Sequence, residues 1–210
     1  VQVPYANVRV NACGWGRQRP DDYQMREILA AIRQGMDEGA AGLSTGLDYI
    51  SECFAGTDEL VEACTALRER RGLYVTHMRY KKGLLPALRE AVEISRRAGV
   101  ALHVSHLKAG TAEDAERVLD YIDREARHEV DFSFDVYPYQ PGSTMLNFLL
   151  PNEVWEDGHS AWWSRKFSMV EFPAAQRSLG RRTAGGPAQA AAGGHPGTLC
   201  RGTGGLRPGI

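Results

Sequence analysis

The sequence predicts an α/β protein in which about five parallel strands alternate with helices. Short apolar runs alternate with longer stretches whose apolar residues recur every three or four positions, and short loops join them. Regular alternation of strand and helix is typical of a parallel sheet. We expect the strands near residues 8–13, 40–45, 73–77, 101–106 and 131–136.

Capping residues mark the expected helices. Asp21 or Asp22 can cap a helix that Gly39 stops, and Thr57 and Thr111 can cap two later ones. We expect these three helices to run to about residues 38, 71 and 126. A further helical pattern lies between the third and fourth expected strands.

Charge is divided unevenly along the 210 residues, although the net charge is only −1. Residues 1–157 hold 18 Lys and Arg against 25 Asp and Glu, whereas residues 158–210 hold seven against one. Residues 176–210 also contain ten glycines and no acid. We therefore expect a βα domain over 1–157, followed by an irregular segment, 158–210, that is either a disordered tail or an off-frame translation.

Composition and charge limit the partners and the cellular location expected of the protein. The small net charge gives no general attraction to nucleic acid, and no apolar run approaches the ~18 residues of a membrane span. The cysteines form no CxxC pair or even framework, which favours a reduced, cytoplasmic location. They are Cys13, Cys53, Cys64 and Cys200.

Two consecutive expected strands each end in a histidine. The run LYVTH ends in His77, and VALHVSH ends in His106. Parallel strands of a βα unit direct their carboxyl ends to one face, where two imidazoles can converge on a single cation such as zinc. The alternative is that each is a hydrogen-bonded structural residue. His103 is interpreted as a packing residue or as a group that supports a ligand.

Four segments in order resemble the barrel-strand signatures of the D-aminoacylases, the N-acyl-D-amino-acid deacylases of the zinc-dependent amidohydrolase superfamily. They are EGAAGLSTGLDY, YVTHMR, AVEISRRAGVALHVSHLKA and DVYPYQPGST followed by LLP. The opening VPYANVR is also similar to the VPHGNVR-like segment of that family. The resemblance covers about residues 1–157 and implies an incomplete TIM-like (β/α) barrel.

The resemblance implies a zinc hydrolase that cleaves N-acyl-D-amino acids to a carboxylate and a free D-amino acid. It assigns zinc binding to His77 and His106, by their match to the THMR and SHLK motifs. Lys108 and Ser143 would bind the substrate carboxylate, and Tyr49 and Tyr137 would wall the pockets for the acyl group and side chain.

Departures from the family pattern leave the catalytic residue unassigned. The sequence has no HxH pair on a first strand, its Cys13 does not align with the family's cysteine ligand, and the aspartate expected on a last strand is absent. We therefore expect weak metal binding and little turnover by this chain alone.

Two alternatives stay open. One is a truncated remnant without specific activity, and the other is a relative that acts on cyclic amides, of the dihydroorotase or hydantoinase type. The absence of lysine from GAAGLSTGL argues against the cyclic-amide reading, because those enzymes often use a bridging carboxylated lysine. The exposed edges of a partial sheet also offer a route to self-association.

Overall fold

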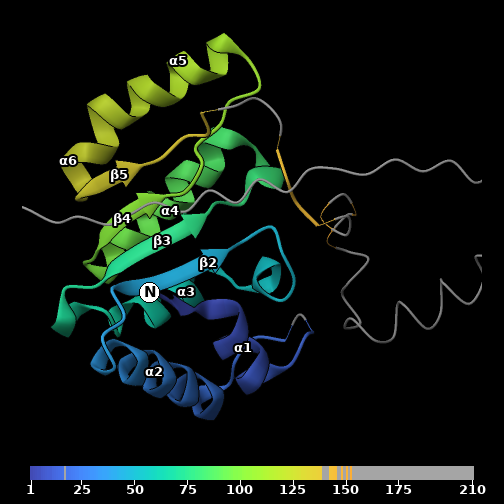
Figure 1. The fold of residues 1–210 in the computed structure, drawn as a ribbon, viewed down its shortest axis with the longest axis vertical. Helices are drawn as coiled ribbons and strands as arrows, with labels where there is room; N and C mark the ends of the chain where they lie inside the picture. The colour runs from blue at the N-terminus through green and yellow to red at the C-terminus, as the bar shows by residue number, and fades with distance from the viewer. Residues whose placement is uncertain (17, 139–141, 146–147, 149, 151, 153–210) are drawn as a thin grey trace, which may run out of the picture. The chain divides into compact units, whose positions relative to one another are not determined.

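The structure is a computed structural model that describes residues 1–16, 18–138, 142–145, 148, 150 and 152 (Figure 1). The predicted domain boundary after residue 157 and the predicted irregular segment lie outside these residues. Within the described ranges, no helix is long and apolar enough to cross a membrane.

In the described part of the chain, five parallel strands form one sheet whose spatial order follows the chain (Figure 1). Every neighbouring pair is parallel, which confirms the predicted α/β class. The edge strands β1 and β5 are short, and self-association through them stays a prediction. The strands are β1 Val3–Pro4, β2 Gly42–Gly46, β3 Leu73–His77, β4 Ala101–Val104 and β5 Phe132–Phe134.

Helices connect the strands, and each long helix packs on the next along the chain. They are α1 Tyr5–Cys13, α2 Asp22–Asp37, α3 Thr57–Thr65, α4 Leu84–Ala98, α5 Ala112–Tyr121 and α6 Arg127–Glu129. A π-helical turn at Ile122–Ala126 joins α5 to α6. Short 3₁₀ turns cover Glu52–Phe54, Arg68–Arg70 and Tyr80–Lys82.

The strand predicted at residues 8–13 is wrong, because these residues belong to helix α1. Alternating valines in NVRVNAC suggested a strand, but the buried side chains of the segment are Tyr5 and Arg9, which are spaced for one helical face. The Tyr5 hydroxyl and the Arg9 Nε both donate to Glu59 Oε1, at 2.8 and 2.7 Å. This long-range ion pair, buried between α1 and α3, overrides the local strand preference.

The ends of helix α3 also differ from the prediction. Gly56 is the residue before the helix, and Thr57 is its first residue, whose hydroxyl donates to Glu90 Oε1 at 3.1 Å. The helix ends at Thr65 and a 3₁₀ turn follows it. The other two predicted caps are confirmed, since the side chains of Asp21 and Thr111 accept backbone N–H groups of α2 and α5.

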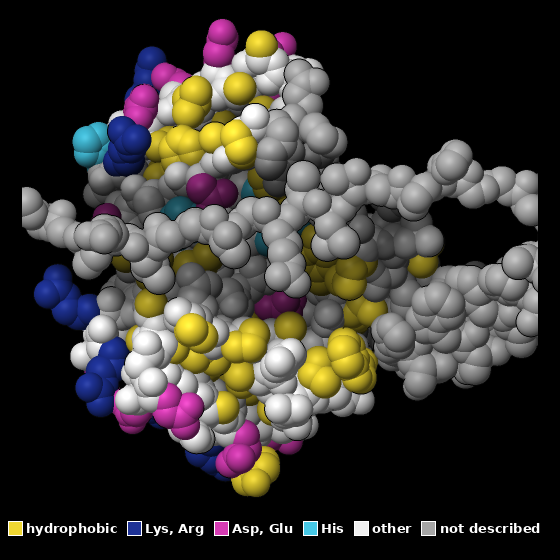
Figure 2. Space-filling view, viewed as in Figure 1, with side chains coloured by type: hydrophobic (Ala, Val, Ile, Leu, Met, Phe, Trp, Pro, Cys, Tyr) yellow, Lys and Arg dark blue, Asp and Glu magenta, His cyan; other side chains and the backbone are white. Residues whose placement is uncertain are grey.

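The two faces of the sheet have different environments. Leu43, Tyr74 and Leu102 are register partners on neighbouring strands, and all three are completely buried. The residues one step along each strand face the other way, and His103 and Ser133 on that side are half-buried and exposed. In the space-filling view, histidine and acidic side chains lie near the middle of the visible face, with hydrophobic side chains on either side (Figure 2).

Candidate metal and substrate site

The two strand-end histidines meet at the carboxyl edge of the sheet. His77 is the last residue of β3, whereas His106 lies two residues beyond the end of β4. His77 Nδ1 and His106 Nε2 are 3.0 Å apart. Two nitrogen ligands of one tetrahedral zinc ion, each at about 2.0–2.1 Å from the metal, would lie at a similar separation.

A buried aspartate holds the outer nitrogen of His77. Asp48, which follows β2, is 2% exposed, and its Oδ2 lies 3.2 Å from His77 Nε2. Its Oδ1 accepts the backbone N–H of Lys81 at 3.2 Å. Both carboxylate oxygens therefore contact groups on the segment that begins with β3.

The backbone of His106 has a left-handed conformation, with φ of 43°. This region is uncommon for a residue with a side chain and needs support from its surroundings. Asp135 Oδ1 accepts the His106 N–H at 2.7 Å, and the Tyr80 hydroxyl donates to the His106 carbonyl at 3.1 Å. Asp135 is itself fixed through Oδ2 by His103 Nε2 at 2.9 Å.

His106 has the properties of a neutral imidazole. Burial, together with the neighbouring His77, lowers its pKa below the ordinary value. Its Nδ1 is buried and has no hydrogen-bond partner among the described residues. A neutral imidazole can act as a metal ligand through its unprotonated nitrogen, and the nitrogen of His106 that faces His77 is Nε2.

Aromatic rings surround the histidine pair. The Tyr49 ring centroid lies 5.0 Å from that of His77, and the Tyr137 centroid lies 5.5 Å from that of His106. Phe148 packs against both Tyr49 and His77, at 5.3 and 6.0 Å. Both predicted pocket tyrosines therefore lie beside the predicted ligands.

The two predicted carboxylate-binding residues lie differently. Lys108 is exposed, and its Nζ lies 5.1 Å from the centre of the Tyr80 ring, which also contacts His77. Ser143 is exposed, and it is the neighbouring Thr144 whose Oγ1 lies 3.0 Å from the Tyr49 hydroxyl. The structure thus brings Lys108 next to the site through Tyr80, and it places Ser143 beside a residue that contacts Tyr49.

Arg79 anchors the loop that carries Asp48 and Tyr49. Its guanidinium is 2% exposed and donates to the carbonyls of Leu47, Cys53 and Ala55. Its Nε also forms an ion pair with Glu90 Oε2 at 3.0 Å.

The same loop contains a buried carboxyl, that of Glu52. Its Oε2 accepts the Gly46 N–H at 3.0 Å, and its Oε1 has no hydrogen-bond partner among the described residues. Burial raises the pKa of Glu52 to about 7. This carboxyl therefore changes its charge near neutral pH.

The described side chains supply only two nitrogen ligands for a metal ion. No group of three or more His, Cys, Asp or Glu side chains in this part of the chain is arranged to hold one. His77 and His106 can supply two of the three protein ligands that a catalytic zinc ion usually has. Their facing nitrogens, the neutral state of His106 and the carboxylate behind His77 all suit this role.

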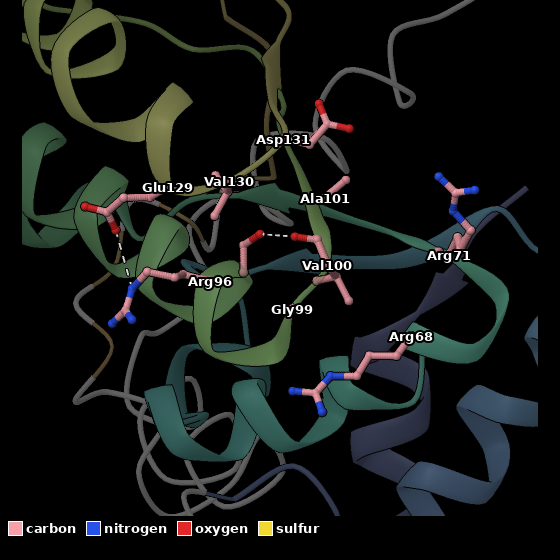
Figure 3. A pocket seen from close by; sticks show the side chains of 11 residues that line it. Arg68, Arg71, Arg96, Gly99, Val100, Ala101, Glu129, Val130 and Asp131 are labelled. Carbon is pink, nitrogen blue, oxygen red and sulfur yellow. Dashed lines mark hydrogen bonds and ion pairs between the residues drawn. The ribbon is translucent and has the colours of Figure 1, made fainter.

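A cavity of about 410 Å³ lies at the opposite edge of the sheet, where β3, β4 and β5 begin (Figure 3). Arg68 donates to the carbonyls of Arg97 and Ala98 at the end of α4, and Arg96 pairs with Glu129 at 3.4 Å. These contacts join structural elements to one another, as is usual for the amino edge of a βα fold.

The sequence is similar to known deacylases over part of their length. No family model matches the sequence. A D-aminoacylase of Alcaligenes xylosoxydans xylosoxydans is 36% identical over 127 residues, covering 57% of this chain and 26% of that protein. An N-acyl-D-aspartate deacylase of the same organism is 32% identical over 179 residues, covering 80% of this chain and 36% of the relative.

A solved structure extends the likeness to the fold. The N-acyl-D-glutamate deacylase from Bordetella bronchiseptica, complexed with zinc and a phosphonate inhibitor, matches with a TM-score of 0.59 at 30% identity. The match covers 64% of this chain and 29% of that structure. This chain is related to the N-acyl-D-amino-acid deacylases. It spans about a quarter to a third of the length of these deacylases.

Proposed function

We propose that this chain carries two zinc ligands and part of the substrate wall of an N-acyl-D-amino-acid deacylase. The observation that supports this most directly is the 3.0 Å separation of His77 Nδ1 and His106 Nε2 at the ends of adjacent parallel strands. The related deacylase from Bordetella bronchiseptica, whose structure contains zinc, supports the choice of metal. The substrate class is that of the relatives, an amide between a carboxylic acid and a D-amino acid.

The two imidazoles would hold the metal as neutral ligands. The lowered pKa of His106 keeps its imidazole unprotonated at neutral pH, so little proton release opposes metal binding there. A zinc ion held by His77 and His106 would supply a bound water of lowered pKa, about 7, and polarisation of the scissile carbonyl.

Other residues at this edge would orient the substrate. Tyr49 packs against His77 and Tyr137 against His106, and both would offer apolar walls to the substrate. Lys108, held over Tyr80, would place its ammonium near the α-carboxylate of the substrate, and Ser143 would donate a hydrogen bond to that group. A cation at this place would select substrates that carry a free carboxylate.

The incomplete ligand set favours a second candidate, a remnant that has the fold of a deacylase and no turnover. Catalytic zinc usually has three protein ligands, and the described residues supply two. We propose that this chain by itself turns over little or no substrate. The cyclic-amide alternative remains disfavoured, because the β2 strand, GLSTG, offers no lysine to bridge two metals.

A zinc titration of the full chain tests the proposal. We expect about one zinc per chain, with binding at least about 100-fold weaker in His77→Ala because the variant loses a ligand. His128→Ala is the matched control, since it removes an exposed imidazole from α6. Equal binding by all three proteins would contradict the proposed site, and no binding by any would favour the remnant.

A further inference from the structure

The buried carboxylate of Asp48 has no role in the function proposed so far. Its side chain is completely buried, and a buried carboxylate is costly unless each oxygen has a hydrogen-bond donor. Among the described residues, Oδ1 has the Lys81 N–H, and Oδ2 has only His77 Nε2 at 3.2 Å. Whether Asp48 Oδ2 accepts a hydrogen bond therefore depends on which nitrogen of His77 carries the proton.

A carboxylate can accept hydrogen bonds and cannot donate them. If the His77 proton were on Nδ1, the lone pairs of Nε2 and of Asp48 Oδ2 would face each other 3.2 Å apart in a buried place. A proton on Nε2 removes this repulsion and forms a charge-assisted hydrogen bond. The lone pair of Nδ1 then points toward His106 Nε2, which lies 3.0 Å away.

We propose that Asp48 is a positioning residue that fixes His77 as its Nε2–H tautomer and so presents Nδ1 as a metal ligand. The part that concerns metal rests on the function proposed above. The part that concerns the tautomer rests on the contacts of Asp48 alone.

The loop around Asp48 is built to hold it in place. Arg79 binds the carbonyl of Leu47, immediately before Asp48, and the carbonyls of Cys53 and Ala55 further along the loop. The Lys81 N–H follows β3 and ties the loop to the strand that carries His77. A carboxylate fixed from both sides orients the ring with little loss of entropy on metal binding.

The first test measures the tautomer of His77 in the absence of metal. In the zinc-free chain at pH 8, the ¹⁵N chemical shifts of the His77 ring should show a proton on Nε2. Asp48→Ala should give a mixture of tautomers, whereas Asp48→Asn should keep part of the preference, because its amide oxygen can still accept. A proton on Nδ1 in the wild-type chain, or an unchanged tautomer in Asp48→Ala, would overturn the inference.

The second test reads zinc affinity by competition with a chromogenic chelator. Removal of a carboxylate that supports a ligand typically weakens binding about 10–100-fold, and we expect this for Asp48→Ala, with a smaller loss for Asp48→Asn. Asp123→Asn, which changes an exposed acid paired with Arg127, is the matched control and should bind as wild type does.

The two tests separate the two proposals. Wild-type affinity in Asp48→Ala would overturn the positioning role and leave the zinc site standing. No zinc binding by the wild-type chain would contradict the proposed function and the metal part of this inference, while the tautomer measurement would still decide what Asp48 does to His77. Circular dichroism of each variant identifies any that fails to fold.

Discussion

The two edges of the sheet use polar side chains in different ways. At the amino edge, Arg68 donates to helix carbonyls and Arg96 pairs with Glu129. These two arginines, which line the cavity, are therefore bound to other groups of the protein. At the carboxyl edge, the two nitrogens that we propose as metal ligands, His77 Nδ1 and His106 Nε2, face each other at 3.0 Å. Polar groups that are fully satisfied stabilise a fold, whereas groups left available can bind something else.

Arg79 is the counterpart of Arg68 at the carboxyl edge, and its loss should have the largest effect on stability. Arg79→Met would leave three carbonyls and Glu90 without their partner in a buried place, which we expect to cost about 3–5 kcal/mol. Urea denaturation measures this change. Because the same carbonyls hold the loop of Asp48, zinc binding should weaken too.

Arg96→Met is the control for that experiment. Its ion pair with Glu129 is exposed, so the expected change is within about 1 kcal/mol. Equal losses in both variants would mean that the buried contacts of Arg79 are not what distinguishes the carboxyl edge.

Glu52 adds a dependence on pH at the carboxyl edge. Its folded pKa of about 7 lies above the ordinary value of 4.5, so the folded chain retains a proton that the unfolded chain releases. This contribution to stability is full below pH 4.5 and is lost as pH rises through 7. The stability of the wild-type chain relative to Glu52→Gln should therefore fall by about 3 kcal/mol over this range.

Denaturation of both proteins at several values of pH between 4.5 and 8 measures the difference. Glu62→Gln, at an exposed position of α3, should parallel the wild type at every pH. A constant difference between wild type and Glu52→Gln would show that the Glu52 carboxyl stays ionised in the folded chain.

Arg68→Met at the amino edge should have a small effect. It removes hydrogen bonds to the carbonyls of Ala98 and Arg97 from an exposed arginine, which we expect to cost about 1 kcal/mol. Zinc affinity should not change, because the cavity lies at the other ends of the strands. A loss of zinc binding in this variant would show that the amino edge affects the metal site, which would contradict the distinction between the two edges.

The sequence predicted the part of the fold in which local pattern and tertiary contacts agree. Strand β3 lies where LYVTH predicted it, and His77 ends that strand. The helix at Tyr5–Cys13 could not be predicted from its valines, because the contact that favours it joins Arg9 to a glutamate 50 residues away in sequence.

The same distinction applies to the site. A histidine at each of two strand ends is a pattern within the sequence, and the structure places those two rings together. Asp48 was missed, although an acid two residues after the small-residue run GLSTG was a usable signal. Its contact with His77 spans 29 residues and depends on the register of β2 against β3.

The left-handed backbone of His106 bears on how such a site could be moved into another protein. The motif SHLK is continuous in sequence, but the conformation of its histidine is held by Asp135 from the next strand and by Tyr80 from the previous one. Grafting the four-residue motif alone would leave the histidine free to relax to an ordinary backbone angle and turn its ring away. The smallest transplantable unit is three adjacent strand ends.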